Sequence, residues 1–162
     1  MKLSSYQANG FYLLNEQTLL HNGGYISYKA AAVNIVKGDY LIFSAGYVTN
    51  TATAVQLLLV AGIAAENCDN SAGAAGDLSV LVIPLLECLQ FSVPVANDAL
   101  ITQAAVGVGY DLEANDDIDI SDTTLVAGAK AFVVDDFDDS AAAIDGNTYG
   151  YAIGHFKQVT VA

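Results

Sequence analysis

The stretch LSVLVIPLLECLQFSVP, from Leu78 to Pro94, decides the fold class because it contains two strand patterns in a row. Residues 78–83 are rich in aliphatic and β-branched side chains. Residues 89–93 alternate apolar and polar side chains with the period of two that a half-buried strand requires. Pro84 and Pro94 each stand at the end of one run, where a missing backbone N–H is tolerated. The stretch therefore predicts two β-strands.

Similar short runs recur outward from this stretch, about every 10 to 15 residues, and Gly, Asn and Asp turns separate them. The predicted strands lie near residues 25–29, 33–36, 40–43, 46–48, 54–65, 78–84, 89–93, 104–112, 117–120, 131–134, 148–156 and 159–161. This spacing predicts an all-β or mainly β fold, with the strands arranged as a compact β-barrel or sandwich.

Helical periodicity is weak, so at most one or two short helices are expected. One is predicted near residues 140–144, with Ser140 as its N-cap and Gly146 just past its end. Residues 66–77 lack a regular pattern and are predicted as a loop. Residues 60–65 resemble residues 149–154, but this echo is too short to indicate a duplication.

The chain is predicted to divide into an N-terminal arm, residues 1–24, and a single β-barrel-like domain, residues 25–162. The arm lacks alternation but is too apolar for a disordered tail. We therefore expect Phe11, Tyr12, Leu13 and Leu14 to form an interface that becomes ordered against a neighbouring subunit. The alternative is that the same four residues plug the barrel of their own chain.

The composition favours assembly over nucleic-acid binding. Hydrophobic residues make up 54% of the chain and charged residues 14%, which indicates either a large core or a surface buried against partners. The net charge of −13 repels phosphate polyanions and anionic membrane surfaces. The longest apolar run, residues 54–65, is too short to span a bilayer. We therefore expect neither a nucleic-acid nor a membrane partner.

No catalytic motif is found in the sequence, and the chain is predicted not to be an enzyme and to hold no cofactor. His21 and His155 are the only histidines, and neither belongs to a nucleophile or metalloprotease motif. Cys68 and Cys88 match no zinc or redox spacing, so two free thiols are favoured over a disulfide.

One acidic segment has the ligand rhythm of a calcium loop. The oxygen-bearing residues at the loop positions are Asp111, Glu113, Asn115, Asp117, Asp119 and Asp122. Asp116 replaces the glycine that such a loop needs for its sharp turn, and Asp122 is shorter than the usual glutamate. The alternative is an acidic turn that leads into a strand at residues 117–120. A second acidic cluster, residues 135–139, is open to the same two interpretations.

Several short phrases resemble the small β-barrel decoration proteins of tailed-phage capsids. They are Gly38-Asp39 before a strand, Gly46-Tyr47-Val48, Ala61-Gly62-Ile63-Ala64-Ala65, Gly76-Asp77-Leu78-Ser79-Val80, and the closing Tyr149-Gly150-Tyr151-Ala152-Ile153-Gly154. The resemblance covers residues 36–156, and the insertion at residues 83–98 and the many aspartates depart from it.

This resemblance implies a non-enzymatic structural protein that decorates or stabilises a capsid lattice. It implies a homotrimer or a similar oligomer that contacts the major capsid protein on the virion surface, after assembly in the host cytoplasm. The alternative function is a calcium- or glycan-binding β module on a fibre or cell surface.

Overall fold

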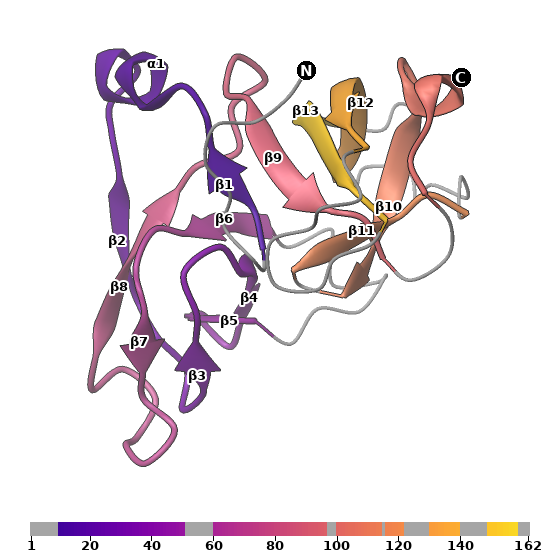
Figure 1. Cartoon of the computed structure of the whole chain (residues 1–162). Helices are drawn as coiled ribbons and strands as arrows, with labels where there is room; N and C mark the ends of the chain where they lie inside the picture. The colour runs from indigo at the N-terminus through magenta and orange to yellow at the C-terminus, as the bar shows by residue number, and fades with distance from the viewer. Residues whose placement is uncertain are drawn as a thin grey trace.

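The computed structural model describes residues 10–50, 60–96, 100–114, 116–121, 130–139 and 149–158 (Figure 1). The predicted helix at 140–144, the predicted strand at 159–161 and the first part of the run at 54–65 lie outside these residues. Within the described ranges, no helix is long and apolar enough to cross a membrane.

The described chain is mainly β with short helices, which confirms the predicted fold class. The helices are α1 (Glu16–His21) and the 3-10 helix η2 (Gln103–Ala105). The strands are β1 (Tyr12–Leu13), β2 (Ile26–Lys29), β3 (Asn34–Ile35), β4 (Tyr40–Ser44), β5 (Tyr47–Thr49), β6 (Val60–Ala64), β7 (Cys68–Asp69), β8 (Ser79–Ile83), β9 (Phe91–Pro94), β10 (Gly109–Ala114), β11 (Asp117–Asp119), β12 (Lys130–Asp138) and β13 (Tyr151–Gln158).

Strands occur in two stretches for which none was predicted: the acidic cluster at 135–139, interpreted as a calcium loop or an acidic turn, and the loop predicted at 66–77. Residues 135–138 belong to β12, which pairs with β13 along its whole length and contains a bulge between Val134 and Asp136. Asp135 points outward, whereas Asp138 is buried, so carboxylates occupy both sides of a strand that its neighbour holds in place. Within residues 66–77, β7 pairs with β3 as a two-stranded ribbon.

The strands form two larger sheets, in which every strand pair is antiparallel. One has the order β1-β9-β13-β12-β10-β11 and the other β2-β8-β6-β4-β5. Each sheet is curled, so that two of its strands that are not hydrogen-bonded neighbours meet at a single parallel bridge. Ala30, after β2, pairs with Val48 of β5 in one sheet, and Val95, after β9, pairs with Ile118 of β11 in the other. In the described chain neither sheet forms a continuous closed barrel, and a sandwich of two curled sheets fits the arrangement.

The two sheets repeat one fold. We call β2, β4, β5, β6 and β8 unit 1, and β9 to β13 unit 2. Numbered in chain order within each unit, the strands lie side by side as first, fifth, fourth, second and third in both. The bridge that closes the curl joins the first and third strands in both units. Figure 1 shows unit 1 on the left and unit 2 on the right.

The repeat extends to the register of individual residues. We call two residues equivalent when they occupy the same position on corresponding strands of unit 1 and unit 2, as fixed by their cross-strand partners. The matched cross-strand pairs are Ile26↔Val82 with Phe91↔Gly154, Ser27↔Leu81 with Ser92↔Ile153, Tyr28↔Val80 with Val93↔Ala152, Lys29↔Ser79 with Pro94↔Tyr151, and Leu41↔Gly62 with Tyr110↔Phe132. At the closing bridge, Ala31 N–H donates to Val48 C=O and Ala96 N–H donates to Ile118 C=O, both at 2.8 Å.

A glycine turn precedes the second strand of each unit. Gly38 has a φ of 96° and Gly107 a φ of 84°, a region in which residues with a β-carbon are strained. Gly38 N–H donates to Ala64 C=O at 2.9 Å, and Gly107 N–H donates to Val134 C=O at 2.7 Å. Ala64 and Val134 are themselves equivalent, so the two turns make the same bond to the fourth strand.

An aromatic cluster packs the two units and the N-terminal segment together. It consists of Phe11, Tyr40 from unit 1, and Phe91, Phe132 and Phe156 from unit 2. The ring centroids of Phe11 and Phe156 lie 5.0 Å apart, and those of Tyr40 and Phe156 lie 5.7 Å apart. In Figure 1, β1 lies between the two units. Phe11, which directly precedes β1, is buried in this core.

Candidate interaction surface

The β2–β8 ribbon in unit 1 exposes two apolar side chains, one on each of its faces, that unit 2 buries at the equivalent positions. Ile26 is 38% exposed and Leu81 39%, whereas their equivalents, Phe91 and Ile153, are both 0% exposed. We call Ile26, Ser27, Lys29, Ser79 and Leu81 the open ribbon. All five are exposed.

The N-terminal segment contributes to the difference, because β1 covers the edge of β9 and does not cover the edge of β2. β1 pairs with β9, so that Tyr12 lies opposite Ser92 and Leu13 opposite Phe91. Leu14 packs against the buried pair Tyr151 and Ile153. Among the described strands, none pairs with the corresponding edge of β2.

This placement corrects the predicted arm interface. Phe11 is 2% exposed inside the core of its own chain, so it is not available to a neighbouring subunit. Tyr12, Leu13 and Leu14 are half-buried against unit 2. The described part of the predicted arm, residues 10–24, is therefore integrated with the domain at 25–162, as in the alternative of a segment that plugs its own chain. The physical reason is that β9 supplies a strand edge to β1, and that aromatic side chains of both units bury Phe11.

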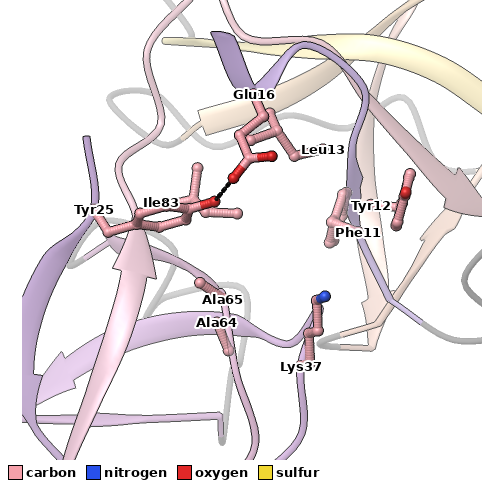
Figure 2. Close-up of a pocket in the computed structure, with 9 residues that line it drawn as sticks. All are labelled: Phe11, Tyr12, Leu13, Glu16, Tyr25, Lys37, Ala64, Ala65 and Ile83. Atoms are coloured by element: carbon pink, nitrogen blue, oxygen red, sulfur yellow. Dashed lines mark hydrogen bonds between the residues drawn. The ribbon is translucent and has the colours of Figure 1, made fainter. Parts of the chain in front are cut away.

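A small hollow lies where the N-terminal segment meets unit 1 (Figure 2). Its cavity volume is about 130 Å³, below the range of roughly 300–1,000 Å³ that is usual for small-molecule sites. Tyr25 Oη donates to Glu16 Oε1 at 2.7 Å across the hollow, and this bond raises the pKa of Tyr25 to about 12. The lining residues are Phe11, Tyr12, Leu13, Glu16, Tyr25, Lys37, Ala64, Ala65 and Ile83. The hollow fits a packing defect at a seam better than a ligand site.

The predicted calcium segment forms a β-hairpin rather than a helix-flanked loop. Asp111 of β10 lies opposite Asp119 of β11, with a register shift before Asp117. Asp119 Oδ1 accepts the backbone N–H of Ser121 at 2.8 Å, which is a local turn contact. Asn115 and Asp122 lie outside the described residues, and so does the side chain of Glu113.

No group of three or more His, Cys, Asp or Glu side chains in the described part of the chain is placed to hold a metal ion. The second acidic cluster contributes an ion pair instead. His155 Nδ1 lies 3.0 Å from Asp135 Oδ2 across neighbouring strands. Both side chains are partly exposed, so the pair lies on a solvated sheet face and encloses no space for a substrate.

Asp39 is a buried carboxylate with a structural role. It follows the Gly38 turn, and its Oδ2 accepts the N–H of Val36 and the side-chain amide of Asn50, both at 2.9 Å. Burial raises the pKa of Asp39, and the two hydrogen bonds oppose that shift. The carboxylate stabilises the turn at the start of β4. The two cysteines are free, as predicted, with Cys68 buried and Cys88 exposed.

Sequence reasoning missed the open ribbon, although one signal for it is present. In β8, Val80 and Val82 point inward, so alternation assigns Ser79 and Leu81 to the solvent side. A leucine at a solvent-side position of a strand is the departure that could have marked the surface. No protein-family model, curated protein or solved structure matches this chain in the comparisons.

Proposed function

We propose that this protein is a non-enzymatic structural protein of a virion, which decorates or stabilises a capsid lattice through contacts with other protein subunits. It acts as an oligomer of this chain seated beside the major capsid protein, on the outer surface of particles assembled in the host cytoplasm. The resemblance of residues 36–156 to decoration proteins supports this proposal. The exposure of Ile26 and Leu81 beside the free edge of β2 is the structural observation that carries it.

The open ribbon supports a protein partner because its exposure is specific to one unit. Single exposed apolar side chains are common on soluble proteins and need no explanation. Here, however, Ile26 and Leu81 lie on one two-stranded ribbon, and the chain buries both of their equivalents. A surface that the same fold covers in one copy and leaves open in the other is a natural place for a partner to pack.

The charge agrees with a position on the outside of a particle. A chain with a net charge of −13 is repelled by a packaged genome and remains soluble before it binds. The apolar ribbon then provides binding surface within an otherwise acidic protein. A decoration role needs no catalytic site, and the His155–Asp135 pair is accounted for as a surface contact between strands.

The test is to find the protein on particles. Antibodies raised against the purified protein are applied to purified virions of the phage whose genome encodes the chain, and the gold label is located by electron microscopy. The proposal predicts a label distributed over the capsid surface. A label confined to tails or fibres, or its absence from particles that carry every other structural protein, would contradict the proposal.

A further inference from the structure

The edge of β2 presents the same backbone pattern that β9 uses to bind β1. Leu14 N–H donates to Gln90 C=O at 2.8 Å, and Gly10 N–H donates to Asp116 C=O at 2.9 Å. Hydrogen-bonded pairs recur every second residue in an antiparallel ladder, so Tyr12 and Ser92 exchange the bonds between these two contacts. In unit 1 the equivalents of the three acceptor positions, Gln90, Ser92 and Asp116, are Tyr25, Ser27 and Gly46.

The backbone of Ser27 points away from its own sheet. Ser27 lies opposite Leu81, and Leu81 directs both of its backbone groups to the other side. Its C=O accepts Ala65 N–H at 2.9 Å, and its N–H donates to Glu66 Oε1 at 3.0 Å. Ser27 and Leu81 are therefore a non-hydrogen-bonded pair, and the N–H and C=O of Ser27 face the outer edge.

The side chains around this edge repeat the surface that β1 covers in unit 2. Leu13 lies opposite Phe91, whose equivalent is Ile26, and Leu14 packs on Ile153, whose equivalent is Leu81. Ile26, Ser27, Gly46 and Leu81 are exposed. In Figure 1, β2 lies at the left margin of the molecule, away from unit 2.

We propose that the edge of β2 is a docking site at which an extended, uncharged apolar segment of a partner protein adds as a strand, as β1 adds to β9. The segment pairs with Ser27 and places apolar side chains on Ile26 and Leu81. Main-chain hydrogen bonds supply part of the affinity, and the two apolar contacts supply the selectivity. The occupant is argued from β1, whose Leu13 and Leu14 contact the equivalents of Ile26 and Leu81.

This inference rests on the proposed function for the view that unit 1 binds protein, but it is tested on the isolated chain. The probe is a peptide with the sequence of residues 10–15, extended by C-terminal lysines for solubility, and binding is followed by the backbone amide signals of the full protein. The expected result is saturable binding with shifts centred on Ser27. Shifts centred on Ser92 would show displacement of β1 and overturn the proposal, as would an absence of binding at millimolar peptide.

Two pairs of matched variants test the geometry. Methylating the probe at the amide equivalent to Leu14 removes a bonded N–H, whereas methylating it at Leu13 removes one that faces away from β9. Ser27→Pro removes an outward N–H at the centre of the edge. Lys29→Pro is the matched control, because its equivalent in unit 2 is Pro94 and β9 binds β1 without an N–H at that position. We expect the first member of each pair to weaken binding about tenfold or more and the second to leave it unchanged.

The remaining outcomes separate this inference from the proposed function. Peptide binding that both members of a pair weaken equally would overturn the edge geometry. A dimer of the unmodified chain that Ser27→Pro dissociates would assign the edge to a second copy and overturn the proposed occupant. Particles that bind the chain while the probe does not bind would overturn the docking edge and leave the decoration role intact. Probe binding without particle labelling would overturn the decoration role and leave the docking edge intact.

Discussion

Ser27 and Ser92 hold the same position in two copies of one fold, but β1 pairs with Ser92 and leaves Ser27 exposed. Ser92 is 2% exposed and lies opposite Tyr12, whereas Ser27 faces solvent on the edge of β2. The residues across the sheet differ in the same way, because Ile153 is buried and Leu81 is 39% exposed. The N-terminal segment thus completes unit 2 and leaves unit 1 with an unfilled surface.

Phe11 should be essential for stability, because it joins both units. Phe11→Ala removes a ring that contacts Tyr40, Phe91, Phe132 and Phe156, and we expect a loss of about 3–5 kcal/mol in the free energy of unfolding. Urea denaturation measures it. Leu20→Ala, at a side chain that is 51% exposed on α1, is the control and should change stability by less than about 0.5 kcal/mol. Equal stability of the two variants would contradict the burial of Phe11 in its own chain and favour the predicted arm that becomes ordered against a neighbouring subunit.

The folded protein should be more stable when the hydroxyl group of Tyr40 is removed. The Oη atom is buried and has no hydrogen-bond partner among the described residues, and burial raises the pKa of Tyr40. Tyr40→Phe should therefore raise the free energy of unfolding by about 1 kcal/mol. Tyr25→Phe is the matched control, since its hydroxyl donates to Glu16 and its loss should be neutral or destabilising. A destabilised Tyr40→Phe variant would show that the hydroxyl is bonded.

The buried carboxylate of Asp39 should make a pH-dependent contribution to stability. Because burial raises its pKa in the folded state, the folded chain binds this proton more tightly than the unfolded chain does. The contribution is therefore fully present below the ordinary carboxyl pKa of about 3.9 and is lost as the pH rises through the raised value. Asp39→Asn keeps an oxygen for the contacts from Val36 and Asn50 but cannot ionise.

The measurement compares the free energies of unfolding of the parent chain and Asp39→Asn across this range. Relative to the variant, the parent chain should gain stability as the pH falls from 7 towards 4. A difference that stays constant with pH would show that Asp39 has the same pKa in the folded and unfolded states.

The two thiols should react at different rates with an alkylating reagent. Cys88 is exposed, whereas Cys68 is 7% exposed and its pKa is raised by burial, which lowers the fraction of reactive thiolate. Intact mass spectrometry during iodoacetamide treatment should show one rapid adduct and one slow adduct. Denatured protein, as the control, should take up both at similar rates. A folded protein that takes up neither would indicate a disulfide and contradict the free thiols.

The sequence predicted most of the strands because alternation and turn residues are local signals. The period of two in residues 89–93 and the glycine turn at Gly38 correspond directly to β9 and to the start of β4. The repeat of the two units was missed because equivalent positions share few residue types. The echo between residues 60–65 and 149–154 aligned the fourth strand of unit 1 with the fifth of unit 2, which is the wrong correspondence.

The docking of the N-terminal segment could not be predicted from local pattern. An apolar run such as Phe11 to Leu14 has the same composition whether its own chain or a neighbour buries it. Which surface it covers depends on the curl of unit 2 and the free edge of β9, and both depend on pairings between residues distant in sequence. The acidic cluster at residues 135–139 was interpreted as a calcium loop or an acidic turn for a related reason, since the pairing of residues 136–138 with β13 overrides their low strand propensity.

The measurement that tests the central claim most directly is particle binding by variants of the open ribbon. Virions stripped of this protein are mixed with the purified chain, and the bound fraction is measured after sedimentation. Leu81→Ser should reduce the apparent affinity about tenfold or more, the equivalent of about 1.4 kcal/mol, because Leu81 lies at the proposed contact. Leu20→Ser, which removes another exposed leucine outside the open ribbon, should bind like the parent chain. Equal binding by the two variants, or no binding by the parent chain, would contradict the account.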